Sequence, residues 1–228
     1  MNHFAEPPAT SIEAMGRYCD CMEEVKLRLS IVDVILEQDS VLSTELLDGE
    51  LVCFQLRRVL EQIAFSSLCV HRDIYQDARK DLETAWRAKG ILTQLQLIHP
   101  EFYPRPAIMK KVSGNPVLQL VSLDDGFLTI SDFEFLYDRC SDLIHSWNPF
   151  STRERMIDFE RPLKDWVNRI KMLLNFHYVH LHGVPDLWVV QMVGEDAKVQ
   201  AMFAPRIGEM SEELLIECGL RPSPTDMK

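Results

Sequence analysis

The sequence predicts a mainly α-helical protein: an antiparallel helical bundle that carries one or two small β-hairpins. Two long segments, residues 11–39 and 44–71, repeat their apolar side chains with the period of an α-helix. A further observation predicts the β-structure: two short apolar stretches flank an Asp-Gly turn in the second half of the chain. Hydrophobic residues make up 46% of the 228 residues, which is enough to bury a core.

The first predicted helix begins at Thr10 or Ser11, either of which is a good N-cap residue. Its apolar positions follow one another at alternating steps of three and four residues, the heptad spacing of a helix that packs lengthwise on a neighbour. These heptad positions are Met15, Tyr18, Met22, Val25, Leu29, Val32 and Leu36. The pattern favours a bundle helix or a dimer contact, and we expect the helix to end at Asp39-Ser40.

The second predicted helix, residues 44–71, is apolar on most of its sides and is therefore expected at the centre of the bundle. Further helices are predicted at residues 73–80 and 81–97. The last of them ends at His99-Pro100, because a proline disfavours helix in the residue before it. Residues 100–117 contain four prolines and predict an irregular connector.

The second half of the chain begins with a predicted hairpin. Residues 117–121 and 127–130 flank Asp124-Asp125-Gly126, and an Asp-Gly turn between apolar stretches is a strong hairpin signal. The following Ser131-x-x-Glu134 has the spacing of a capping box, so it predicts the start of a helix that ends at Asn148-Pro149.

A long helix is predicted over residues 153–182, with Pro162 marking either a kink or the true start of the helix. Residues 187–193 and 198–203 flank a polar turn and predict a second hairpin. A short terminal helix is predicted at residues 211–218.

These elements divide the chain into predicted parts. A flexible N-terminus (residues 1–10) precedes a helical bundle domain (residues 11–183), which contains an irregular insert (residues 100–130). A C-terminal hairpin with a short helix (residues 184–220) and a disordered tail (residues 221–228) complete the chain.

Hydropathy and charge argue against several classes of protein. No apolar run reaches the length of about 18 residues that a membrane span requires. The N-terminal residues show no secretory signal pattern, so we expect a cytoplasmic protein without membrane contact. The formal net charge of −11 argues against a broad nucleic-acid-binding face but leaves room for a local basic cleft. The six scattered cysteines predict buried thiols, without disulfides or a structural metal.

The helix predicted after residue 131 carries a cation and an imidazole six residues apart, Arg139 and His145. The arginine guanidinium donates two hydrogen bonds to phosphate oxygens, and histidine exchanges a proton near neutral pH. The pair is therefore suited to RNA cleavage, in which a 2′-hydroxyl of the RNA attacks the neighbouring phosphate. On an ideal helix the two residues lie about 120° apart. Both would border one cleft if the helix lines a dimer groove or loosens at His145, and Asn148 would add a donor. The alternative is a solvated arginine and a histidine that caps the helix C-terminus.

The Arg139-x5-His145 spacing resembles the Arg-x(4–6)-His motif of the HEPN superfamily. The surrounding residues are similar to a bacterial branch of that superfamily, over roughly residues 45–180. The similar segments are Leu56-Arg-Arg-Val-Leu-Glu61, Trp86-Arg-Ala-Lys89, Phe102-Tyr-Pro104 and the spacing of Tyr137, Ser141 and His145. The resemblance implies an α-helical bundle that often dimerises. Many members of the superfamily are metal-independent endoribonucleases of defence or toxin–antitoxin systems, so the resemblance also implies this function.

The resemblance makes Arg139 and His145 the catalytic pair of a homodimer that acts on RNA without a cofactor and has an antitoxin or another protein as partner. Arg57, Arg58 and Glu61 are expected to support the pair, although an ion pair among these three on the helix surface is the slightly favoured interpretation. A cysteine follows Arg139, where the family commonly has a polar residue, and the acidic net charge is a second departure. The rival function is a non-catalytic interaction or scaffold module of the same fold.

Two further histidines, His177 and His180, are three residues apart in the helix predicted at residues 153–182 and form a candidate metal pair. No nearby Asp or Glu completes the three or four ligands that a metal site needs. Capping or exposed histidines are therefore the favoured interpretation, and a helical metalloprotein is the least favoured of the three functions.

Overall fold

A computed structural model describes residues 9–38, 42, 44–78, 87–111, 118–146, 150, 157–183, 186–194 and 196–204. Within these ranges the chain forms six α-helices and one antiparallel sheet of five strands. The prediction of a mainly helical fold with a small β-component is therefore confirmed. No helix in the described ranges combines the length and the apolar character that a membrane crossing needs.

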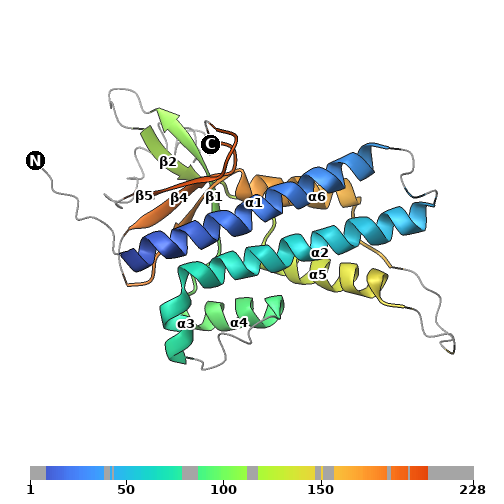
Figure 1. Ribbon diagram of the computed structural model, residues 1–228, viewed down its shortest axis with the longest axis horizontal. Helices are drawn as coiled ribbons and strands as arrows, with labels where there is room; N and C mark the ends of the chain where they lie inside the picture. The colour runs from blue at the N-terminus through green and yellow to red at the C-terminus, as the bar shows by residue number, and fades with distance from the viewer. Residues whose placement is uncertain are drawn as a thin grey trace, which may run out of the picture.

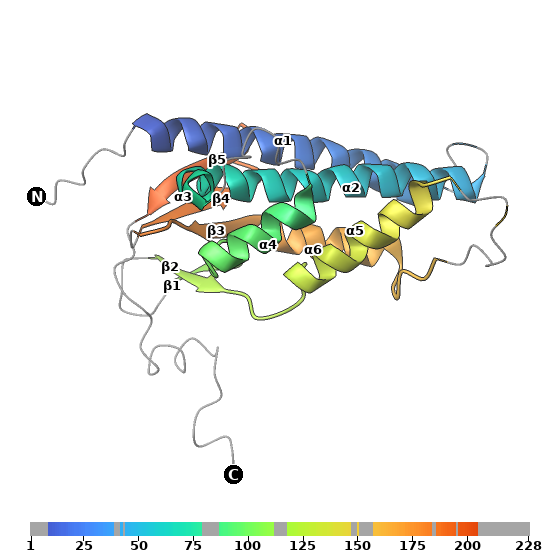
Figure 2. The ribbon, with the colours of Figure 1, turned by 90° about the horizontal axis from the view of Figure 1, so that it is seen from below.

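The two longest helices, α1 (Ala9–Glu37) and α2 (Glu45–Val70), run side by side and form the spine of the molecule (Figure 1). The predicted heptad positions of α1 face the core, and the buried ones are Tyr18, Met22, Val25, Leu29 and Val32. Helix α2 is central, as predicted, because it packs against α1 and also against α4 (Ala88–Ile98) and α5 (Ile130–Ile144). Figure 2 shows α4 and α5 on the side of α2 that faces away from α1.

The chain bends at the end of α2. After His71 the short helix α3 (Arg72–Ala78) leaves in a new direction (Figure 1). Helix α4 ends at Ile98, directly before His99 and Pro100, as the proline predicts. The predicted boundary between helices near residues 80–81 lies outside the described residues.

The sheet has the strand order β2-β1-β3-β4-β5, and every neighbouring pair is antiparallel. Its strands are β1 (Arg105–Lys111), β2 (Leu118–Ser122), β3 (Phe176–His180), β4 (Leu187–Gln191) and β5 (Gln200–Ala204). The sheet lies near the N-terminal part of α1 (Figure 1). The second predicted hairpin is confirmed as β4 and β5, but it shares one sheet with β1, β2 and β3.

The first predicted hairpin is wrong in one of its two strands. Strand β2 pairs with β1, which lies in the segment predicted as an irregular connector, and residues 127–130 form no strand. The left-handed Gly126 (φ 81°) turns the chain toward α5 rather than back along β2. The capping box is also shifted by two residues. Thr129 is the N-cap, and its side chain and that of Asp132 each accept a backbone N–H of the other residue.

The long helix predicted over residues 153–182 is wrong beyond Leu174. Helix α6 (Leu163–Leu174) begins after Pro162, which agrees with the interpretation of that proline as a true start. The helix ends at Leu174, and β3 follows after a single residue. Residues 151–156, the terminal helix predicted at 211–218 and the tail lie outside the described residues.

Candidate functional sites

Arg139 lies on the third turn of α5. The apolar side of this helix, with Phe133, Leu136 and Cys140, is buried against the core. The Arg139 side chain is 36% exposed, and its guanidinium group lies over the ring of Phe135 at 5.6 Å from the centroid. Its Nη2 is 3.4 Å from Asp142 Oδ2, and its Nε is buried without a hydrogen-bond partner. The side chain is therefore held along its own helix and remains open to solvent.

His145 is the C-cap residue of α5. Its backbone is extended (φ −77°, ψ 136°), and its N–H donates to the carbonyl oxygen of Ser141 at 3.2 Å. The His145 side chain is exposed. The helix thus ends at Ile144. Because His145 lies beyond the helix, the angle of about 120° between Arg139 and His145 on an ideal helix does not determine where the imidazole points. Neither Arg139 nor His145 is enclosed in the apolar core.

The three expected supporting residues form a network on α2. Glu61, whose side chain is 13% exposed, accepts hydrogen bonds from Arg57 Nε at 3.3 Å and from Arg58 Nη1 at 2.9 Å. The Tyr137 hydroxyl of α5 donates to the same carboxylate at 3.5 Å, and Arg57 lies 5.0 Å from the Tyr137 ring centroid. The favoured interpretation, an intramolecular ion pair, is confirmed.

This network lies away from Arg139. Tyr137 faces α2, and a residue two positions further along a helix points about 160° away from it. The structure therefore does not join Arg57, Arg58 and Glu61 to Arg139 in one site. Asn148, the other supporting residue of the prediction, lies outside the described residues.

The predicted helical pair His177 and His180 is wrong, because both residues belong to β3. His177 is fully buried, and its Nδ1 donates to the carbonyl oxygen of Leu174 at 2.7 Å. A carbonyl only accepts, so Nε2 carries no proton and accepts the Tyr18 hydroxyl at 2.6 Å. Burial lowers the pKa of His177 to about 4. His180 points to the other face of the strand, where its Nε2 is 3.8 Å from Glu101 Oε1.

The structure brings together other histidines that are distant in the sequence. His71 follows α2, His99 follows α4, and His182 follows β3. The ring centroids of His71 and His99 are 4.9 Å apart, and those of His99 and His182 are 5.4 Å apart. In the part of the chain that the structure describes, no three His, Cys, Asp or Glu side chains are arranged to hold a metal ion.

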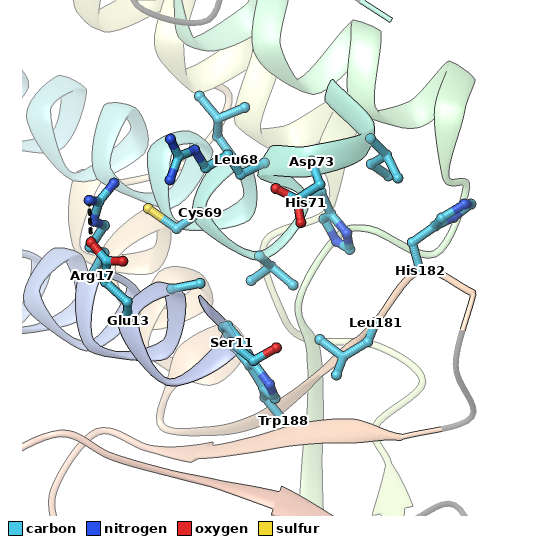
Figure 3. Close-up of a pocket in the computed structure, with 14 residues that line it drawn as sticks. Ser11, Glu13, Arg17, Leu68, Cys69, His71, Asp73, Leu181, His182 and Trp188 are labelled. Carbon is cyan, nitrogen blue, oxygen red and sulfur yellow. Dashed lines mark hydrogen bonds and ion pairs between the residues drawn. The ribbon is translucent and has the colours of Figure 1, made fainter. Parts of the chain in front are cut away.

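A cavity of about 520 Å³ opens beside this cluster (Figure 3). It lies between the first turns of α1, the junction of α2 and α3, Leu181 and His182 just after β3, and Trp188 of β4. His71 lines the cavity and is 2% exposed, and neither of its ring nitrogens has a hydrogen-bond partner of good geometry. Burial, and then the neighbouring His99, lower the pKa of His71 to about 3.

The cavity is suited to a small polar molecule. A neutral His71 offers one donor and one acceptor, and the Trp188 Nε1 donor is also buried without a partner. Buried polar groups in native proteins are normally satisfied by protein, water or ligand. Sequence reasoning missed this site, because its residues come from four distant segments. The only local signal is that each histidine stands just beyond the end of a helix or strand.

Comparison with protein-family models gives no match, and comparisons with curated proteins and with solved structures find no significant similarity.

Proposed function

We propose that this protein is a metal-independent endoribonuclease of a bacterial defence or toxin-like system, acting in the cytoplasm as a homodimer. The proposal rests on the resemblance of Arg139-x5-His145 to the HEPN motif. The structural observation that supports it is the end of α5 at Ile144, which leaves the His145 imidazole exposed beyond the helix. This end of the helix is consistent with the loosening at His145 under which we expect both side chains to reach a common substrate.

The reaction would be a transesterification. Neutral His145 accepts the proton of the 2′-hydroxyl, the 2′-oxygen attacks the adjacent phosphorus, and an imidazolium returns a proton to the leaving 5′-oxygen. The Arg139 guanidinium stabilises the negative charge that grows on the phosphoryl oxygens. One histidine per chain suits a dimer, because two copies across a two-fold axis would supply both the base and the acid.

Arg139 must exchange Asp142 for phosphate in this scheme. The two side chains are 3.4 Å apart and are 36% and 54% exposed, and a pair of this kind contributes only roughly 0.2–1 kcal/mol. A bidentate contact with phosphate is stronger than this monodentate ion pair. Asp142 therefore presents a small barrier to substrate binding.

The test is cleavage of a synthetic RNA and of total RNA by the purified full chain in the presence of a chelator. We expect products that end in a 2′,3′-cyclic phosphate and no cleavage where the 2′-hydroxyl is replaced by hydrogen. Arg139→Ala and His145→Ala should each reduce the rate by at least about 100-fold, the usual contribution of such groups. Arg87→Ala, an exposed arginine at the start of α4, is the matched control and should retain full activity.

Intact RNA at a molar excess of the wild-type chain would refute the nuclease. Equal cleavage by the wild type and by both alanine variants would refute it as well, because the activity would then belong to a contaminant. Circular dichroism of each variant shows whether a lost activity reflects lost structure.

The second candidate function is a non-catalytic interaction module of the same fold. It is favoured by apolar side chains that remain exposed on the two longest helices, Leu27 (62%) and Val34 (52%) on α1 and Leu47 (45%) and Phe54 (47%) on α2. Residues seven apart lie on one side of a helix, so each pair forms a stripe. If this surface joins two copies, Phe54→Asp should lower the sedimentation mass while leaving the helical content unchanged. An unchanged mass would exclude this face as the dimer contact.

A further inference from the structure

Four cysteines in the described part of the chain lie in two pairs, and each pair joins α2 to a neighbouring helix. The thiols of Cys21 on α1 and Cys69 on α2 are neighbours that interact, and so are those of Cys53 on α2 and Cys140 on α5. All four are free thiols. Sequence analysis treated these residues alike, but the structure places the two pairs in different surroundings.

The surroundings differ first in access. Cys53 and Cys140 are 0% exposed and belong to the core. Cys21 and Cys69 are partly exposed, and Cys69 lines the 520 Å³ cavity (Figure 3). A small molecule that enters the cavity therefore meets the sulfur of Cys69, whereas the Cys53–Cys140 pair is closed to solvent.

The surroundings differ also in charge. Arg17 and Arg72 line the same cavity as Cys69, together with Asp73 and with Glu13, which is ion-paired with Arg17. The interaction with the Cys21 thiol lowers the pKa of Cys69, and the two arginines lower it further, whereas burial and the Asp20 carboxylate oppose this. The arginines matter because Cys69 lies in the last turn of α2, where the helix dipole disfavours an anion. At Cys140, the contact with Cys53 and burial both raise the pKa of the thiol.

We propose that Cys69 is a peroxide-reactive cysteine and that Cys21 is its resolving partner. The Cys69 thiolate attacks one oxygen of a hydroperoxide: the S–O bond forms, the O–O bond breaks, and the other oxygen leaves as an alcohol or water after taking up a proton. The Cys21 sulfur then attacks Cys69 Sγ: the S–S bond forms, the S–O bond breaks, and water leaves. In total, two thiols are oxidised to a disulfide and one hydroperoxide is reduced.

The resulting disulfide would join α1 to α2 beside the cavity. Because the two thiols are neighbours across the contact between α1 and α2, the bond would link sulfur atoms that the fold already brings together. This inference is independent of RNA cleavage, since Cys21 lies on α1 and Cys69 on α2, whereas Arg139 and His145 belong to α5 and its C-cap. Its test therefore needs no nuclease activity.

The experiment treats the reduced full chain with hydrogen peroxide and, separately, with an organic hydroperoxide, and then blocks the remaining thiols with N-ethylmaleimide. We expect a loss of two of the six thiols, a mass before the maleimide step that is lower by about 2 Da for the two hydrogens removed, and a Cys21–Cys69 linked peptide. Cys53 and Cys140 should remain reduced and react with maleimide only after denaturation.

Three variants separate the roles. Cys69→Ser should slow thiol loss at least about tenfold, and Cys21→Ser should halt the reaction at a sulfenic acid on Cys69 that dimedone traps. Cys19→Ser is the matched control and should leave the rate unchanged. Cys19 has a similar partial exposure on α1, but burial and the acidic Asp20 and Glu23 raise the pKa of its thiol.

Arg17→Gln should slow the reaction of Cys69, and Arg17→Lys should restore most of the rate, because the effect depends on positive charge. The proposal is overturned if Cys53 or Cys19 oxidises as fast as Cys69 in the wild-type chain, or if no Cys21–Cys69 peptide forms. Since these readings come from the wild type, they hold even if a cysteine variant fails to fold.

Discussion

The buried His177 predicts how the stability of this protein depends on pH. In the folded chain its imidazole is fully buried between the Tyr18 hydroxyl and the Leu174 carbonyl, and burial lowers its pKa to about 4. In the unfolded chain a histidine has a pKa of about 6.5. Between these values the unfolded state binds more protons than the folded state. The free energy of unfolding is therefore highest above pH 6.5 and falls as the pH is lowered toward 4.

The magnitude follows from the two pKa values. Lowering the pH from 7 to 5 stabilises the unfolded state by about 2 kcal/mol through this one residue, while the folded state remains almost unprotonated at His177. The buried His71, with a pKa of about 3, adds a loss of similar size and sign. The sum of about 4 kcal/mol is a large fraction of the 5–15 kcal/mol that stabilises a typical domain.

The assay is urea unfolding followed by circular dichroism at pH 7 and pH 5. His177→Asn retains a donor toward Leu174 but cannot be protonated. It should lower the stability at pH 7 and reduce the loss between pH 7 and pH 5 by about 2 kcal/mol relative to the wild type. His145→Gln, a change at an exposed histidine, is the control and should retain the full loss. A wild-type stability that is equal at the two pH values, or an unaltered difference in His177→Asn, would refute the reasoning.

Two further predictions concern the start of α5 and two glycines, and both are measured by urea unfolding at pH 7. Asp132 accepts the backbone N–H of Thr129 and also binds Arg169 at 2.7 Å, so Asp132→Ala should cost about 2 kcal/mol, against about 1 kcal/mol for Thr129→Ala. Equal losses would contradict this double role. Gly126→Ala should destabilise by about 1 kcal/mol because its φ is +81°, whereas Gly16→Ala, within α1 and with open space around the added methyl, should stabilise by up to about 1 kcal/mol. The same sign for both changes would refute the backbone argument.

The helices were predictable because their hydrogen bonds and side-chain periodicity are local. The heptad steps of α1 locate its buried face, and the apolar circumference of α2 predicts its central place. Pro100 and Pro162 mark a helix end and a helix start for equally local reasons.

The strands were less predictable, because the partner of a strand lies elsewhere in the chain. Strand β3 follows α6 after only Asn175, so its apolar residues continue the helical pattern and only one residue separates the two elements. Strand β1 contains Pro106 and ends in Lys110 and Lys111, a composition typical of a connector. It becomes a strand because β2 pairs along it and because His177 and Tyr178 of β3 pair with its first two residues.

The candidate sites also contain features that the sequence predicts and features that it does not. Arg139 and His145 are visible as residue types at a known spacing, and the ion pairs of Arg57 and Arg58 with Glu61 follow from helical geometry. The separation of that network from Arg139 is not visible in the sequence, because it depends on Tyr137 facing α2.

By itself, the sequence determined the helical class of this protein, the buried faces of its two longest helices and the residues of its proposed nuclease motif. Only the tertiary structure decided that His71, His99 and His182 meet beside a cavity, and that Cys69 opens onto it while Cys53 does not. The physical reason is that helical periodicity is a property of neighbouring residues. The burial, charge and access of a side chain depend on segments that approach it from far along the chain.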